Sequence, residues 1–226
     1  MKKTTRGTNS RRARSTSLQR RSELTRSSVL AAALGEFARN GLDGARVDRI
    51  AQRARVNKQA LYYHFGSKKD LFRATLASVY ADTVPVERFR AAPDLTPEFA
   101  MRALINTLFE FFRRLEDEMA IIAHENRHRG KHLTPKIQEQ IRNSVSPIIQ
   151  AVREVLVRGQ REGVFSHDID AVDLYMTLVA EIMFYFSNAY TLSAIVQRDL
   201  SSDKAVEYWK THVANFTIAA LRPGRV

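Results

Sequence analysis

The chain of 226 residues has no cysteine, which excludes disulfides, thiolate zinc sites and a cysteine nucleophile. Glycine and proline are scarce, with nine and six residues, and this favours long helices over a turn-rich sheet protein. No apolar stretch follows the basic N-terminus to form the core of a signal peptide, and no window approaches the roughly 18 apolar residues that a membrane span needs. We therefore expect a soluble, cytoplasmic protein.

The positive charge is concentrated near the N-terminus. The net charge is +12, and residues 1–80 hold 18 Lys and Arg against 5 Asp and Glu, whereas residues 81–226 hold 18 against 19. A solvated basic surface is one interpretation of this asymmetry. A nucleic-acid partner is the better one, because contacts with phosphates supply much of the affinity of such complexes. The neutral remainder indicates a second task on the same chain.

The first 40 residues predict a basic arm followed by a helix. Residues 1–21 are rich in Ser, Thr and Arg and contain one Leu, so they cannot bury enough apolar area to be ordered, and we expect a disordered arm. Its arginines could lie along DNA or serve only as a solubilising tail, and both alternatives stay open. From about Thr25 to Phe37 apolar residues recur at helical spacing, and Asn40-Gly41 predicts the end of that helix.

Two short helices come next, at about 47–54 and 58–64, and a fourth helix begins after Ser67. Only Arg55 and Val56 separate the short pair, and Asn57 is a good N-cap for the second of them. Two helices of this length joined by so short a turn have the dimensions of a DNA-reading helix-turn-helix. The sequence therefore predicts a helix-turn-helix domain over residues 22–80.

The second helix of such a motif places its exposed side chains in the major groove. Lysine can bond guanine and glutamine can bond adenine, so we expect base reading from its exposed residues Lys58, Gln59 and Tyr63. Three further residues suit the phosphates: Tyr62, His64 and Lys68. The last of these stands at a helix N-terminus, where the dipole also favours an anion.

From about residue 96 onward the pattern is helical with few breaks. We expect helices over 96–115, 118–127, 134–163, from Asp168 or Asp170 to about 196, and from Ser201 or Ser202 to just before Pro223, with a kink at Pro147. The predicted fold class is all-α. It combines an N-terminal three-helix helix-turn-helix domain with a larger C-terminal helical effector and dimerisation domain over residues 81–226.

Four segments of the first third resemble the TetR family of bacterial transcriptional regulators: 37–41 (FARNG), 47–51 (VDRIA), 56–65 (VNKQALYYHF) and 66–71 (GSKKDL). The stretch LYYHF followed by Ser67-Lys68 is the most specific. The resemblance implies an all-helical homodimer on a palindromic DNA operator, with an effector pocket and the dimer interface in the C-terminal domain. It also implies that Tyr62, His64 and Lys68 contact phosphates. The expected function is that of a regulator, most simply a repressor that a small-molecule effector releases.

The chain departs from the family pattern at two positions. Arg55 stands where the family usually has Gly, and a left-handed backbone there costs a non-Gly residue roughly 1 kcal/mol. Arg46 follows Ala45 where the family tends to place a hydroxyl residue before the helix, so a capping group is lost. Two expectations follow for Arg55: a slightly reshaped turn, or an added phosphate contact. We expect Arg46 to serve as a longer-reaching phosphate contact in place of the lost cap.

The last two predicted helices contain apolar residues at helical spacing that suit either a dimer interface or the core of one chain. The candidate interface residues are Leu174, Leu178, Ile182, Met183, Val206, Trp209, Val213 and Phe216. Polar groups inside otherwise apolar helices are candidates for an effector pocket. These are His124, Glu181, Tyr185 and Asn188.

One motif supports an enzyme instead. Residues 124–128 (HENRH) fit the H-E-x-x-H pattern of zinc metalloproteases, in which two His bind the metal and Glu is the general base. A third ligand at the spacing of the extended motif is missing, because His132 follows His128 by four residues and not six, and Arg127, Arg129 and Lys131 would repel a cation. A helical metal protein or hydrolase is therefore the weaker alternative, and we expect no enzymatic activity, cofactor or metal.

Overall fold

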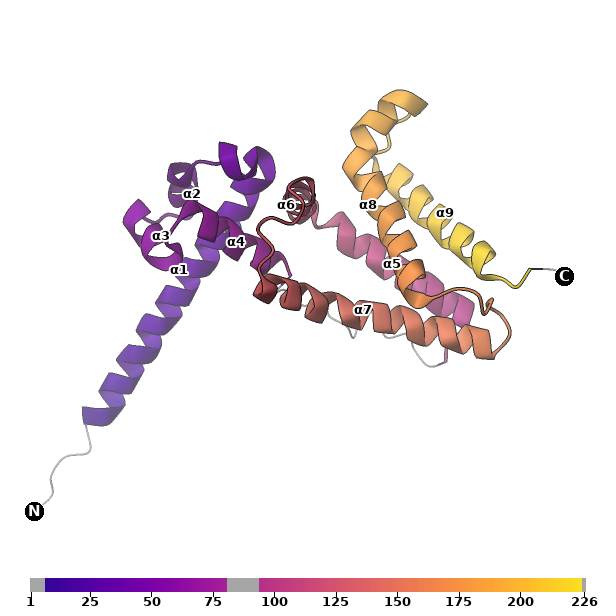
Figure 1. Cartoon of the computed structure of the whole chain (residues 1–226), viewed down its shortest axis with the longest axis horizontal. Helices are drawn as coiled ribbons and strands as arrows, with labels where there is room; N and C mark the ends of the chain where they lie inside the picture. Colours follow the sequence, from indigo (N-terminus) through magenta and orange to yellow (C-terminus); the bar gives the residue numbers. More distant parts are fainter. Residues whose placement is uncertain (1–6, 81–93, 225–226) are drawn as a thin grey trace, which may run out of the picture. The chain divides into compact units, whose positions relative to one another are not determined.

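The computed structural model describes residues 7–80 and 94–224, and every regular element within these ranges is an α-helix (Figure 1). The all-α prediction is therefore confirmed. The chain forms two compact units. Of the described residues, unit 1 contains 7–79 and 120–133, and unit 2 contains 80, 94–119 and 134–224. The sequence interpretation placed 120–133 in the C-terminal domain, whereas the structure groups this segment with the N-terminal helices.

Unit 1 begins with a helix that is longer than expected. Helix α1 covers Gly7–Gly44 and is followed by α2 (Val47–Arg53), α3 (Lys58–Phe65) and α4 (Lys68–Val79). The prediction of a disordered arm over residues 1–21 is wrong from Gly7 onward, and residues 1–6 lie outside the described ranges. Residues 8–34 contain neither Gly nor Pro, so nothing in the backbone chemistry ends the helix there.

The core of unit 1 lies between α1 and α4. Phe37 and Phe72 are fully buried, and their rings meet edge to face with centroids 5.1 Å apart. Leu61 and Phe65 of α3 are also buried, as the sequence predicts. The two short helices therefore rest on a scaffold made by the two longer ones.

Gly41 breaks α1 near its end with φ 63° and ψ −177°, which confirms the predicted stop. The helix α6 (Glu116–Arg127) supplies the neighbour at this position. His124 Nε2 accepts a long hydrogen bond from Leu42 N–H at 3.4 Å, and a Cβ on Gly41 would lie only 2.6 Å from His124 Cε1. Burial lowers the pKa of His124, with help from His128 and Arg127, and this favours the neutral ring that can accept the bond.

Unit 2 contains the helices α5 (Pro97–Arg113), α7 (Pro135–Arg161), α8 (Ala171–Val196) and α9 (Asp203–Leu221). A short polar side chain caps each N-terminus by accepting a backbone N–H, and the four caps are Thr96, Thr134, Asp170 and Ser202. Helix α7 is a single helix through Pro147. Helix α5 packs against α7, α8 and α9 around one apolar core.

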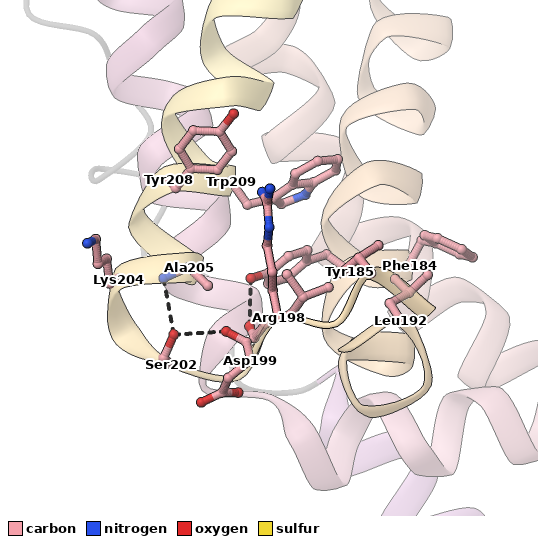
Figure 2. Close-up of a pocket in the computed structure, with 12 residues that line it drawn as sticks. Phe184, Tyr185, Leu192, Arg198, Asp199, Ser202, Lys204, Ala205, Tyr208 and Trp209 are labelled. Carbon is pink, nitrogen blue, oxygen red and sulfur yellow. Dashed lines mark hydrogen bonds between the residues drawn. The ribbon is translucent and has the colours of Figure 1, made fainter. Parts of the chain in front are cut away.

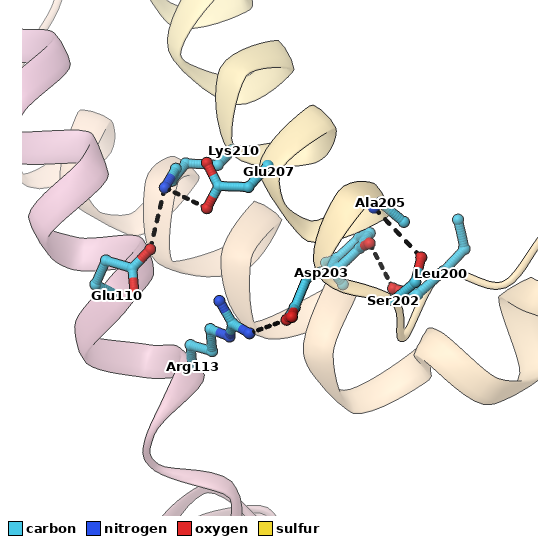
Figure 3. A network of polar contacts seen from close by, with 9 residues as sticks. Glu110, Arg113, Leu200, Ser202, Asp203, Ala205, Glu207 and Lys210 are labelled. Carbon is cyan, nitrogen blue, oxygen red and sulfur yellow. Dashed lines mark hydrogen bonds and ion pairs between the residues drawn. The ribbon is translucent and has the colours of Figure 1, made fainter.

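Ion pairs join α5 to α9 at the edge of this core (Figure 3). The Lys210 ammonium lies 3.0 Å from Glu110 Oε1 and 2.7 Å from Glu207 Oε1, and Arg113 pairs with Asp203. Lys210 is half-buried, so its charge needs the two carboxylates that face it. These pairs fix the N-terminal half of α9 on α5.

Helix α8 is long and apolar enough to cross a membrane by length and composition, which the sequence analysis did not expect. In unit 2 its residues Leu174, Leu178 and Ile182 are buried in the shared core, and it also carries Asp173 and Glu181. Burial in unit 2 explains only part of this apolar character, because Met176 and Phe184 of the same helix are exposed.

The Gly41 geometry predicts unequal costs for two glycine substitutions. Gly163 also has a positive φ of 72°, but no atom lies within 4 Å of a Cβ placed there. We expect Gly163→Ala to lower the free energy of unfolding by about 1 kcal/mol, and Gly41→Ala to lower it by about 2 kcal/mol or more because His124 must also move. Urea unfolding followed by circular dichroism measures both. Equal losses would show that the His124 contact contributes nothing.

Candidate nucleic-acid interface

The turn between α2 and α3 has the hydrogen bonds of a Schellman motif. Val56 N–H donates to Ala51 O at 3.0 Å, and Arg55 N–H donates to Gln52 O at 3.1 Å. Arg55 has φ 57°, so it adopts the left-handed conformation for which the sequence comparison expected Gly. The turn keeps its shape despite the arginine, whose side chain is exposed.

Helix α3 exposes the side chains that the sequence predicts for base reading. The Asn57 side chain accepts Ala60 N–H at 2.7 Å, which confirms the predicted cap. Gln59 is exposed, and Tyr63 is 86% exposed. Lys58 is exposed too, but its ammonium lies 2.8 Å from Asp48 Oδ1 of α2, and that hydrogen bond raises the pKa of Lys58. Lys58 must leave Asp48 to reach a base.

The five residues predicted to contact phosphates lie at four places in unit 1: before α2, in the turn, on α3 and at the start of α4. Arg46 is the N-cap of α2, Arg55 lies in the turn, and both are exposed. Tyr62 is exposed and His64 half-buried on α3, and the Lys68 ammonium donates to the Asp43 carbonyl at 3.0 Å. All five lie around the ends of α2, α3 and α4.

Glu36 positions the start of α2, a role that the sequence analysis missed. Arg46 makes no side-chain cap at the start of α2, as the lost hydroxyl predicts. Instead the carboxylate of Glu36, which is 2% exposed, accepts Arg46 N–H at 3.1 Å and lies 3.9 Å from Arg49. A carboxylate near a helix N-terminus is also favoured by the dipole. The sequence did contain a signal for this role: an acidic residue, Glu36, stands next to Phe37 in the apolar part of α1, where a buried carboxylate needs a partner.

Two family models match this chain, one over the helix-turn-helix region and one over the C-terminal helices. Residues 29–75 match the model described as bacterial regulatory proteins, tetR family, and residues 97–216 match the tetracyclin repressor-like C-terminal domain. The chain belongs to the TetR family. It is a DNA-binding transcriptional regulator with a helix-turn-helix in unit 1.

Relatives of this TetR-family regulator cover most of its length. The HTH-type transcriptional repressor NicS of Pseudomonas putida is 30% identical over 198 residues, which is 88% of this chain and 92% of that protein. The HTH-type transcriptional repressor SCO4008 of Streptomyces coelicolor is 33% identical, covering 70% and 76%. A TetR family transcription regulator of Marinobacter aquaeolei shares the fold, with TM-score 0.66, 20% identity and coverage of 91% and 100%.

The H-E-x-x-H segment has a structural role in unit 1. Glu125 and His132 are both buried, and Glu125 accepts His132 N–H at 2.5 Å while His132 Nδ1 lies 2.8 Å from Glu125 Oε2. The carboxylate is therefore buried and holds the segment 125–132 together through both of its oxygens. Across residues 7–80 and 94–224 no group of three side chains is arranged to hold a metal.

The four effector-site candidates do not come together. A pocket of about 600 Å³ lies between the end of α8 and the start of α9 (Figure 2), and Tyr185 is the one candidate that lines it. Glu181 and Asn188 are on α8 but not in its lining, and His124 belongs to unit 1. Burial raises the pKa of Glu181, an effect that His212 partly offsets. The assignment of these four residues to an effector site stays a prediction.

The structure also corrects most of the predicted dimer interface. Five of its residues lie in the core of unit 2 and cannot face another copy: Leu174, Leu178, Ile182, Val206 and Val213. Met183 and Trp209 are half-buried, and only Phe216, at 58%, is well exposed. Packing within one chain, the other interpretation of this pattern, explains the five buried residues.

Glu36 gives a prediction for the stability of unit 1. Glu36→Gln keeps the shape but removes the charge from the bond to Arg46 N–H, so we expect about 1 kcal/mol less free energy of unfolding and weaker DNA binding. Glu36→Ala should lose more, because Arg46 N–H is left without its acceptor. Glu23→Gln on the exposed face of α1 is the matched control and should change little. A Glu36→Gln protein as stable as the control would refute this role. Urea unfolding and operator titration provide the two measurements.

Proposed function

We propose that this regulator is a repressor that binds a palindromic operator as a homodimer and is released by a small-molecule effector. The observation that carries the proposal is the outward face of α3, where Gln59 and Tyr63 stand exposed directly after a well-formed turn. A recognition helix needs such a face, because its N-terminal side chains meet the base edges. The names of NicS and SCO4008, both repressors, support the direction of regulation.

In this proposal, base contacts and phosphate contacts come from different residues. Gln59 and Tyr63 contact bases. Lys58 contacts a base as well once its ammonium has left the Asp48 carboxylate. The exposed Arg46, Arg55 and Tyr62, together with His64 and Lys68, contact the phosphates and set the register on the duplex. The net charge of +12 adds affinity that falls with salt.

The surface for the second copy is the exposed apolar face of α8 and α9. On α8 it includes Met176, at 62%, and Phe184, at 57% exposed. On α9 the rings of Tyr208, His212 and Phe216 follow one another at one-turn spacing, with centroids 6.5 and 6.2 Å apart. Large exposed apolar side chains in one area mark an interaction site. We call this set of residues the α8–α9 face.

A dimer on an operator sets two recognition helices one DNA turn apart, about 34 Å. Effector binding in unit 2 changes their separation or tilt, so both half-sites can no longer be bound together. Linkage requires that the operator weaken effector binding by the same factor. The protein acts in the cytoplasm, where the DNA is, and it acts by binding rather than by catalysis.

Base reading by Gln59 can be tested by fluorescence anisotropy on DNA from the upstream region of its gene. We expect Gln59→Ala to cost about 1–3 kcal/mol on the operator and almost nothing on a random duplex. Arg55→Gln should weaken both complexes alike and lower the salt slope by about 1. Gln150→Ala, an exposed glutamine of unit 2, is the control. If the wild type binds both duplexes equally, sequence-specific repression is refuted.

The dimer proposal is tested by placing a charge on the α8–α9 face. Phe216→Glu should raise the dimer dissociation constant by about tenfold or more, because a desolvated carboxylate without a partner opposes association. Phe99→Glu is the matched control, since Phe99 is a 65% exposed phenylalanine of the same unit on α5. Sedimentation velocity measures both proteins. Two variants that dimerise equally well would place the interface elsewhere.

A further inference from the structure

The pocket between α8 and α9 has an apolar floor and walls. Tyr185 and Trp209 stack with centroids 5.4 Å apart and planes 11° apart, and Leu192 and Val196 also line the space. Its volume of about 600 Å³ lies within the range of roughly 300–1,000 Å³ that small-molecule sites occupy. The lining comes from α8, α9 and the loop 197–202 that joins them, all within unit 2.

Most polar groups of this loop already have partners. The Tyr185 hydroxyl donates to Leu200 O at 2.6 Å, and burial, then Asp199, raises its pKa, which keeps the proton in place. Ser202 Oγ donates to Asp199 O at 3.0 Å and accepts Ala205 N–H at 3.4 Å (Figure 2). The Asp199 carboxylate accepts both Ser201 N–H and Ser201 Oγ–H. The loop is thus held in shape without a ligand, so the pocket is already formed.

Two cationic side chains of the lining, Arg198 and Lys204, are not engaged in this way. Both side chains are exposed, and neither takes part in an ion pair with a carboxylate in the part of the chain that the structure describes. In Figure 2 the Arg198 side chain extends up the pocket to the level of Trp209 and Tyr208, whereas Lys204 points away from it. A guanidinium beside an aromatic wall is suited to a carboxylate, which it can bind through two parallel hydrogen bonds.

We propose that this pocket binds a small organic acid, with its apolar body against Tyr185 and Trp209 and its carboxylate on Arg198. Of the two unpaired cations only Arg198 extends along the apolar walls. This arrangement favours an amphipathic anion over a neutral or polyanionic ligand, because neither of those satisfies both the walls and the charge. The link from this ligand to the operator rests on the proposed function, whereas the binding itself does not. Phe184 and Tyr208 belong both to the lining and to the α8–α9 face, so a second copy bound to that face would border the pocket.

The single tryptophan of the chain, Trp209, makes the proposal directly measurable. The full-length protein is titrated with phenylacetate and, in parallel, with its neutral analogue phenylethanol, and Trp209 fluorescence is followed. We expect saturable binding of phenylacetate and about tenfold weaker binding of the alcohol. Arg198→Gln should lower phenylacetate affinity about tenfold and leave the alcohol unchanged. Arg142→Gln, which removes an exposed arginine of α7 outside the lining, is the matched control.

Three outcomes overturn the site: no saturable signal, equal affinity for the acid and the alcohol, or an Arg198→Gln protein that binds like the control. A phenylacetate affinity that falls as protein concentration rises also overturns it, because a second copy would then be filling the pocket. Operator binding is measured on the same samples. Saturable binding with unchanged operator affinity supports the site and refutes its regulatory role, whereas failure to bind any operator refutes the proposed function alone.

Discussion

The edge-to-face contact between Phe37 of α1 and Phe72 of α4 is the constraint on which unit 1 depends. Helices α2 and α3 have seven and eight residues, and isolated helices of that length are unstable in water. They keep their shape because α1 and α4 form a packed scaffold beneath them. The rings of His124 and His132 also meet Phe72, at 5.8 and 5.1 Å, so the segment 120–133 joins the same cluster. The recognition face can therefore stay polar and exposed.

Local chemistry made the helix boundaries predictable from the sequence. The caps at Asn57, Thr96 and Thr134 each satisfy an amide three residues away, so the residues that decide them are neighbours in the chain. The left-handed backbone of Arg55 was expected from the resemblance instead, because the family usually has Gly at this position. The helix-turn-helix and its exposed side chains follow from these local signals.

Long-range contacts were not predictable in this way. Helical spacing shows that α8 is apolar but not which face meets the core, so buried Leu178 and exposed Met176 look alike in the sequence. Leu42 and His124 are 82 residues apart, and no local sequence pattern around either residue predicts their hydrogen bond. The pocket forms because the loop 197–202 brings α9 back against α8. The sequence alone does not show that this loop places Arg198 in the lining of a pocket. Composition also failed for α1, where a polar, Arg-rich stretch continues a helix.

The division of the chain into units has a consequence for synthesis. Unit 1 includes residues 120–133, which leave the ribosome after the whole of α5 has been made. Until then Phe72 lacks the two histidine rings beside it, and Leu42 N–H lacks its acceptor. Domains near the N-terminus generally fold first during translation. Here the helix-turn-helix can assemble early but reaches its final form late, and a fragment cut after α4 would retain that unfinished state.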